Sequence, residues 1–225
     1  MARLARVVAP GCPHHVTQRG NRRLETFFSE ADYQAYLGLL AETCAQAATE
    51  VWAYCLMPDH VHLILVPSHP DGLRAALGEA HRRYTRRINQ REDWRGHLWQ
   101  ERFHSFPLDE PHLAAAVRYV ERNPVRAGLA RQPEDWAWSS ARAHLAARDD
   151  DLVRVAPLLE RYPDWPAYLG AATQEATLET LRGHGRTGRP LGSESFVARL
   201  ETMLGRRLGA GRPGRPRKAP EPTNK

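Results

Sequence analysis

This 225-residue chain has few cysteines and no long apolar run. Its three cysteines, Cys12, Cys44 and Cys55, are widely spaced and form no CxxC pair, which excludes a zinc ribbon or a disulfide framework and predicts reduced thiols. No apolar stretch approaches the ~20 residues that a membrane-spanning helix needs. Residues 1–6 lack the apolar core of a signal peptide. We therefore expect a globular, cytoplasmic protein that does not bind membranes.

Lysine is also nearly absent, because all but two of the 32 basic residues are arginine. Such a bias arises in GC-rich genomes, and arginine also suits bidentate phosphate contacts better than lysine does. The net charge of +6 is unevenly distributed: residues 130–181 contain 5 bases and 9 acids, whereas residues 182–225 contain 11 bases and 3 acids. A basic body and tail around an acidic middle indicate an anionic polymer as partner.

The most informative stretch is His60-Val61-His62, which follows a Pro-Asp turn. Two apolar runs flank that turn and predict a hairpin with strands at 50–57 and 60–66. Side chains alternate along a strand, so the two histidines share one face, and imidazoles about 6–7 Å apart can converge on one metal ion. An isolated His-x-His is more often an ordinary polar pair, so its role depends on the rest of the chain.

Hydrophobic periodicity predicts an ordered series of strands and helices. After a short strand at 16–19, the chain is expected to form a helix at 30–48, the hairpin, a second helix at 73–90 and a last strand at 97–106. This order is the split βαβ arrangement of a ferredoxin-like α+β fold, with an antiparallel sheet and both helices on one face. The histidine strand is then central in the sheet. His15, just before the first strand, is expected to pack against its surroundings, with metal contact as the alternative.

A third helix is predicted at 110–122, followed by a helical extension and a basic tail. Tyr119 and Asn123 lie four residues apart on one face of this helix, so both point toward the histidine pair if the helix packs across the sheet. A short helix is expected to begin at 136–141, and residues 157–182 and 193–208 are also expected to be helical. The Gly-Arg-Pro repeats near the C-terminus are typical of a minor-groove arm or of a disordered, solubilising tail.

The second half of the 73–90 helix is crowded with arginine and carries a tyrosine. With one acid nearby, Glu92, this charge exceeds what solvation requires and favours phosphate contact. Tyr84 is a competing nucleophile there, although its place on the apolar stripe favours a core position. Trp99, Phe103 and Phe106 are expected in the core or stacked on unpaired bases. The crowded arginines are Arg82, Arg83, Arg86, Arg87 and Arg91.

Five motifs occur in the order and spacing of one known family. They are His15-Val16-Thr17-Gln18-Arg19-Gly20-Asn21, Met57-Pro58-Asp59-His60-Val61-His62, Leu98-Trp99-Gln100-Glu101-Arg102-Phe103, Arg118-Tyr119-Val120-Glu121-Arg122-Asn123-Pro124-Val125-Arg126-Ala127-Gly128 and Trp138-Ser139-Ser140. Over residues 1–145 the chain resembles the single-tyrosine HUH transposases of the IS200-like class, and among them the REP-associated tyrosine transposases.

The resemblance implies a nuclease domain at 1–145, which a helical extension (146–182) and a basic, partly disordered, DNA-contacting tail (183–225) would follow. It implies cleavage and transfer of single-stranded DNA beside hairpin repeats, through a 5′-phosphotyrosine on Tyr119. It also implies Mg²⁺ or Mn²⁺ held by His60 and His62, with Asn123 as the third metal ligand, at a position where some relatives carry a longer Gln. We expect a nucleoid-associated monomer or homodimer. The arginines expected to contact DNA are Arg19, Arg82, Arg83, Arg86, Arg87, Arg102, Arg126, Arg189, Arg212 and Arg215.

Two other functions stay open at this point. A metal-dependent phosphoesterase built on His-x-His would recruit further ligands, and only His69 and Asp71 follow, in a loop of poor spacing. A catalytically silent, domesticated protein would bind hairpin DNA through its arginines without cutting it. The products separate the three: a phosphoesterase leaves no protein–DNA adduct, and a silent binder leaves the DNA intact.

Overall fold

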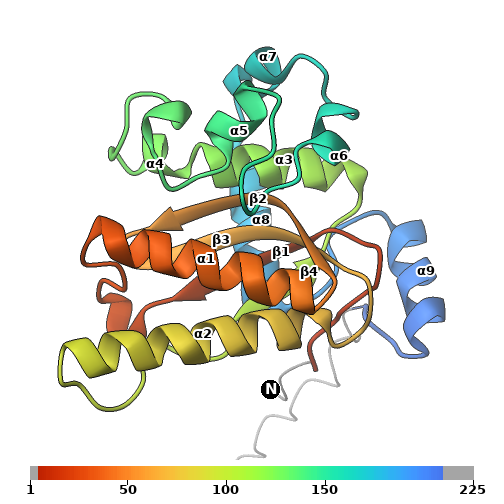
Figure 1. Ribbon diagram of the computed structural model, residues 1–225. Coiled ribbons are helices and arrows are strands. Elements are labelled where there is room, and N and C mark those ends of the chain that lie inside the picture. Colours follow the sequence, from red (N-terminus) through yellow and green to blue (C-terminus); the bar gives the residue numbers. More distant parts are fainter. Residues whose placement is uncertain (1–4, 210–225) are drawn as a thin grey trace, which may run out of the picture.

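Four antiparallel strands form the centre of the structure, a computed structural model that describes residues 5–209 (Figure 1). The strands are β1 (His14–Arg19), β2 (Thr49–Met57), β3 (His60–Pro67) and β4 (His104–Pro107). Their order across the sheet is β2-β3-β1-β4, which is the predicted ferredoxin-like arrangement. The histidine strand β3 lies between β2 and β1, so its central position in the sheet is confirmed.

The pairing register determines which side chains share a face of the sheet. His62 of β3 lies opposite Thr17 of β1, and Thr17 lies opposite His104 of β4. Residues directly opposite one another in an antiparallel pair project to the same side, and so do residues two apart on one strand. His15 and His60 therefore join these three residues on one face, whereas Val61 points to the other face and is fully buried.

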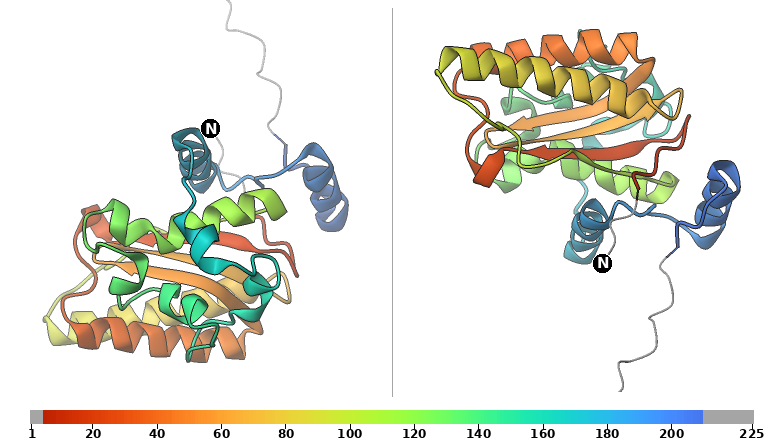
Figure 2. Two further views of the ribbon diagram at one scale, coloured as in Figure 1. Left: turned by 90° about the horizontal axis from the view of Figure 1, so that it is seen from above. Right: turned by 90° about the horizontal axis from the view of Figure 1, so that it is seen from below.

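The Val61 face of the sheet is covered by α1 (Glu30–Gln46) and α2 (Gly72–Arg91), which lie side by side in Figures 1 and 2. Each helix turns the apolar stripe predicted from its sequence toward the strands. Burial of these stripes provides the main hydrophobic stabilisation of this half of the molecule. Fully buried side chains in this layer include Tyr36, Leu40, Leu63, Leu77, Tyr84 and Ile88.

The histidine face of the sheet is covered by α3 (Glu110–Glu121) and by the elements that follow it in the chain (Figure 1). Helix α3 begins at Asp109, whose carboxylate accepts a hydrogen bond from the His112 backbone N–H. Ile64 and Phe106 of the sheet share one hydrophobic cluster with Leu113 of α3 and with side chains from beyond residue 145. The predicted helical extension is thus packed on the sheet and shares a core with the first 145 residues. Its members in this cluster are Leu158, Trp165, Leu169, Leu178 and Leu181.

The remaining helices are short. They are α4 (Asn123–Arg126), α5 (Ala141–Leu145), α6 (Ala156–Leu159), α7 (Trp165–Gly170), α8 (Glu175–Thr187) and α9 (Glu194–Leu204), with 3₁₀ turns η1 (Asn21–Arg23) and η2 (Pro133–Asp135). The expected helix at 193–208 corresponds to α9, which Ser193 caps by accepting the Phe196 N–H at 3.2 Å. Within residues 5–209, no helix combines the length and the apolarity needed to cross a bilayer.

The predicted last strand is wrong in extent. Only residues 104–107 form β4, and the chain before it is a loop with one isolated bridge, between Trp99 and Gly20, the residue that follows β1. The aromatic residues of this stretch are at most 8% exposed, so their expected core position is confirmed. Trp99 and Phe103 pack beside α2, in the same hydrophobic cluster as Tyr84.

The helix expected from residue 136 is also wrong in its first half. Trp138 to Ser140 pair with the edge of β2: the Leu56 N–H donates to the Trp138 carbonyl at 2.8 Å, and the Ser140 N–H donates to the Tyr54 carbonyl at 3.0 Å. The helix, α5, begins only at Ala141. An open strand edge offers unpaired carbonyl and N–H groups, and this segment satisfies some of them.

Candidate active site

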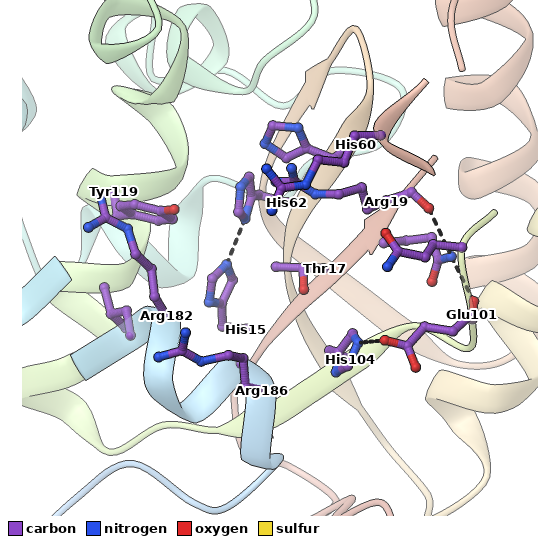
Figure 3. A pocket seen from close by; sticks show the side chains of 15 residues that line it. His15, Thr17, Arg19, His60, His62, Glu101, His104, Tyr119, Arg182 and Arg186 are labelled. Atoms are coloured by element: carbon purple, nitrogen blue, oxygen red, sulfur yellow. Dashed lines mark hydrogen bonds and ion pairs between the residues drawn. The ribbon is translucent and has the colours of Figure 1, made fainter. Parts of the chain in front are cut away.

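A pocket of about 490 Å³ lies over the sheet face that carries the paired histidines. Three strands form its floor, because the register places His15, His62 and His104 on one surface. Helices α3 and α8 form one wall, with side chains that project toward the strands (Figure 3). We call this cavity the histidine–tyrosine pocket.

Tyr119 of α3 lies in this pocket beside both histidine strands. Its ring centroid is 5.2 Å from that of His62 and 6.0 Å from that of His15, with the rings nearly perpendicular in both pairs. Its side chain is 8% exposed, and its hydroxyl points toward His62 (Figure 3). The expectation that the third helix packs across the sheet and carries Tyr119 to the histidines is confirmed.

His60 is held by the acid that precedes it. The Nδ1 of His60 is hydrogen-bonded to the Asp59 carboxylate, which also pairs with Arg19 at 3.5 Å. Burial opposes ionisation of Asp59, but the hydrogen bond from His60 and the charge of Arg19 prevail and lower the pKa of Asp59. In the His60 tautomer that donates its Nδ1 proton to Asp59, the lone pair lies on Nε2.

His62 contacts a second histidine that the sequence did not single out as its partner. His15 Nε2 lies 3.0 Å from His62 Nδ1, and the two rings stack with centroids 5.2 Å apart. Burial lowers the pKa of His15 to about 4 and that of His62 well below its usual value, so both rings are neutral at pH 7. A single proton therefore lies between these two nitrogens. If His62 donates it, the lone pair on His62 Nε2 is free.

His60 and His62 can thus each present an Nε2 without a proton, and such a nitrogen can bind a divalent ion. Asp59 and His15 are the hydrogen-bond partners of the two Nδ1 atoms. Among residues 5–209, no group of three or more His, Cys, Asp or Glu side chains is arranged to hold a metal ion. A site here would therefore rest on two protein nitrogens and leave other positions open to phosphate oxygens and water.

Sequence comparison agrees with this geometry. A family model described as "Transposase IS200 like" matches residues 9–123. This chain belongs to the IS200-like transposase family. All of β1, the His-x-His strand and Tyr119 fall inside the matched region.

Individual relatives in this family are similar over part of their length. The chain is 28% identical over 110 residues to a Haemophilus influenzae protein named as a candidate REP-associated tyrosine transposase; the match covers 44% of this chain and 62% of that protein. It is 23% identical over 121 residues to the REP-associated tyrosine transposase of Escherichia coli K12, covering 53% of this chain and 70% of the relative. A solved structure of a REP-associated tyrosine transposase bound to a REP hairpin shares the fold, with a TM-score of 0.53 at 22% identity over 65% of this chain and 86% of the other.

Asn123, the expected third metal ligand, is engaged elsewhere. It starts α4, its side-chain oxygen accepts a hydrogen bond from Arg126 at 2.7 Å, and it does not line the histidine–tyrosine pocket. The Arg126 guanidinium also stacks over the Tyr119 ring at 4.2 Å. Ligation by Asn123 stays a prediction and requires Arg126 to release the oxygen.

The competing nucleophile Tyr84 is far from this chemistry in the fold. It lies in the core on the opposite face of the sheet, is fully buried, and donates its hydroxyl proton to the Thr26 carbonyl at 2.7 Å. A buried phenol with its proton committed to a backbone carbonyl cannot reach a DNA phosphate. The structure therefore leaves Tyr119 as the nucleophile candidate of the two.

The arginines expected to contact DNA lie in different parts of the structure. Arg19 lines the histidine–tyrosine pocket, and Arg126 reaches it through the Tyr119 ring. Arg102 lies in a neighbouring groove. Arg189 instead donates to the carbonyls at the end of the described chain, including Leu208 at 2.6 Å. Arg212 and Arg215 lie outside the described residues.

The helix α2 arginines have more counter-charge than the sequence suggested. Arg82 pairs with Glu79 and Arg83 with Glu42, both at 2.7 Å, so the expectation of a single nearby acid is wrong. Within residues 5–209, Arg86 and Arg87 form no ion pair and are exposed. All four project from the helix layer opposite the histidines, and phosphate contact by them stays a prediction.

A buried carboxylate links the helix that carries Tyr119 to the rest of this layer. Glu121, two residues after Tyr119, is fully buried and accepts hydrogen bonds from Ser140 and His144 at 2.6 Å each, and from Trp165 at 3.3 Å. Ser140 belongs to the Trp-Ser-Ser motif on the edge of β2. The motif thus helps fix the position of α3, a link that no local sequence pattern could reveal.

Proposed function

We propose that this transposase cleaves and rejoins single-stranded DNA beside hairpin repeats, through a covalent 5′-phosphotyrosine on Tyr119. The observation that carries the proposal is the contact between the Tyr119 phenol and His62 of the paired histidines, with ring centroids 5.2 Å apart. A phenol is a weak nucleophile at neutral pH unless it is positioned and activated. The pocket supplies both a fixed position and surrounding positive charge.

The reaction is a transesterification in which bonds exchange one for one. The Tyr119 oxygen loses its proton and bonds to phosphorus, the bond from phosphorus to the 3′-oxygen breaks, and that oxygen takes up a proton. The strand on the 5′-phosphate side is then held on the protein, with the phosphodiester energy retained. Attack by another 3′-hydroxyl reverses these steps and joins that strand.

The proposed cofactor is Mg²⁺ or Mn²⁺, held by His60 and His62. These two rings fit such an ion, because a His60 that donates from Nδ1 to Asp59, and a His62 that donates from Nδ1 to His15, each leave Nε2 without a proton. When bound, the ion supplies positive charge that polarises the scissile phosphate. Asp59 and His15 hold the rings in place around it.

The proposed partner is hairpin DNA with a single-stranded flank. The solved relative similar in fold is bound to a REP hairpin, and this chain carries Arg19, Arg182 and Arg186 around the pocket where a strand would pass. Arginine is suited to the phosphates of such a strand because its guanidinium can bind two oxygens at once. A net charge of +6 also favours association with DNA.

A labelled hairpin oligonucleotide from the neighbourhood of the gene tests the proposal directly. Wild-type protein with Mn²⁺ is expected to yield a protein–DNA adduct that denaturing gels resolve, and EDTA is expected to abolish it. Tyr119→Phe should form no adduct, whereas the matched variant Tyr84→Phe should form it normally. An adduct that survives Tyr119→Phe would refute the assignment.

The other two functions predict different products in the same assay. Cleavage without an adduct indicates a metal-dependent phosphoesterase. Tight binding that survives EDTA, with no cleavage of any hairpin tested, indicates a catalytically silent, domesticated binding protein. Each outcome rejects the proposed transesterification.

A further inference from the structure

Two arginines from the C-terminal extension lie in the histidine–tyrosine pocket. Arg182 and Arg186 are one helical turn apart on α8, and both project into the cavity (Figure 3). The family match ends at residue 123, more than fifty positions before either of them. Part of the wall of the histidine–tyrosine pocket therefore comes from outside the region that matches the family.

Helix α8 packs against the body of the protein, and this packing holds the backbone of Arg182 and Arg186 in place. Leu178 and Leu181 are buried in the cluster that also holds Phe106 and Tyr119. The helix packs against α3, β1 and β4, which carry Tyr119, His15 and His104 of the pocket. It ends at Gly188, whose positive φ of 69° makes the left-handed turn that glycine adopts most readily.

The two arginines differ in their contacts. Arg182 pairs with Glu175 on its own helix at 2.7 Å, and it also interacts with the Tyr119 hydroxyl; both contacts raise the pKa of Arg182. Within the described part of the chain, Arg186 forms no ion pair and is exposed. Across the cavity, His104 is paired with Glu101 at 2.7 Å. Positive charge from α8 thus faces the floor of the pocket from the Tyr119 side.

We propose that Arg182 and Arg186 are the phosphate-binding arms of this active site, with Arg182 on the phosphate that Tyr119 attacks and Arg186 on a neighbouring phosphate of the same strand. The inference rests on the proposed function. Both guanidinium groups stay protonated throughout, so no proton moves to or from them. Their contribution is to neutralise the charge that builds on the phosphate oxygens as the phosphorus–oxygen bonds exchange.

Four single variants test the assignment: Arg182→Ala, Arg182→Lys, Arg186→Ala and, as a matched control, Arg148→Ala. Arg148 is exposed and lies outside the pocket. Adduct formation is measured in single turnover at saturating protein. DNA affinity is measured separately by fluorescence anisotropy in a Tyr119→Phe background, at several salt concentrations. Thermal melts confirm that the exposed substitutions leave the fold intact.

We expect Arg182→Ala to slow adduct formation about 100-fold with a small change in Kd, in the range found for loss of one donor to a developing oxyanion. Arg182→Lys should recover part of this loss, since it restores charge without the planar fork. Arg186→Ala should weaken binding and reduce the salt slope of affinity by about 0.7, the value for one phosphate of a single strand. Arg148→Ala should match wild type in both measurements.

Arg182→Ala and Arg186→Ala variants that behave like Arg148→Ala would overturn the proposal, as would an Arg182→Ala variant that only weakens binding and cleaves at the wild-type rate when saturated. A wild-type protein that forms no adduct contradicts the proposed function instead. In that case the anisotropy series still decides whether α8 holds a DNA backbone.

Discussion

Replacing His15 separates the role of an outer partner from that of a metal ligand. His15 is 3% exposed on β1, and its Nε2 lies 3.0 Å from His62 Nδ1. Gln can place a side-chain oxygen close to the position of Nε2 and accept the same proton. Phe fills the space of the ring but accepts nothing. His15→Gln and His15→Phe therefore differ chiefly in whether the Nδ1 proton of His62 has an acceptor.

Without that acceptor, His62 loses its preference for the tautomer with a bare Nε2. Loss of an outer partner of this kind typically lowers metal affinity by 10–100-fold, which corresponds to about 1.4–2.7 kcal/mol. We expect His15→Phe to weaken Mn²⁺ binding by this factor, and His15→Gln to remain within about 3-fold of wild type, since it retains the acceptor.

The free energy of unfolding should change far less than the metal affinity does. In the native protein His15 Nδ1 is buried without a hydrogen-bond partner among the described residues, and removing such an orphan gains about 1–3 kcal/mol. His15→Phe in turn leaves His62 Nδ1 unpaired, at a similar cost. The two effects oppose each other, so we expect a net change within about 1 kcal/mol.

Titration of Mn²⁺ followed by the electron paramagnetic resonance signal of the free ion gives the affinities without any need for catalysis. His104→Gln is the control, because His104 lines the same pocket and pairs with Glu101, away from His60 and His62. Equal Mn²⁺ affinity in His15→Phe and His15→Gln would refute the tautomer reasoning. So would a loss of affinity in His104→Gln as large as that in His15→Phe.

Three further predictions concern stability. Glu121→Ala should lower the free energy of unfolding in urea by about 3–5 kcal/mol, because it leaves buried donors, including His144, without an acceptor. Glu121→Gln should lower it less. A decrease below about 1 kcal/mol for the alanine variant would contradict this reasoning. Burial lowers the pKa of His14 to about 4, below its value near 6.5 in the unfolded chain. The unfolded state therefore binds an extra proton as the pH drops from about 6.5 to 4, and the free energy of unfolding falls by up to about 3 kcal/mol. Urea unfolding of His14→Gln should show a shallower fall across that window, and an identical slope would show that His14 does not titrate there. Gly20→Ala should lower the free energy of unfolding, measured in a thermal or urea melt, by about 1–3 kcal/mol, since the new Cβ would lie 2.2 Å from the Leu24 carbonyl oxygen. An unchanged free energy of unfolding would mean that the η1 turn relaxes freely.

The sequence by itself determined the order of the strands and the face of the sheet that carries the paired histidines. Alternation along a strand has a fixed period of two, so His60 and His62 had to share a face and Val61 the other. Helical spacing placed Tyr119 on a face that could meet them. These are local rules, since they depend only on residues close together in the chain. For the same reason the helices at 30–46, 72–91 and 110–121 were predicted within a few residues of their observed bounds.

Only the tertiary structure decided which distant groups meet at that site. The His15–His62 contact joins residues 47 positions apart. Arg182 lies beside Tyr119 on a helix whose existence the local sequence pattern could predict, but whose position in the fold it could not. The same limit explains the errors. Trp99 and Phe103 are buried beside α2 although residues 97–103 form a loop, and Trp138 to Ser140 are extended because the β2 edge offers them partners. Hydrogen bonds and apolar burial in a packed interior are available only from neighbours in space, which the order of residues does not specify until the chain has folded.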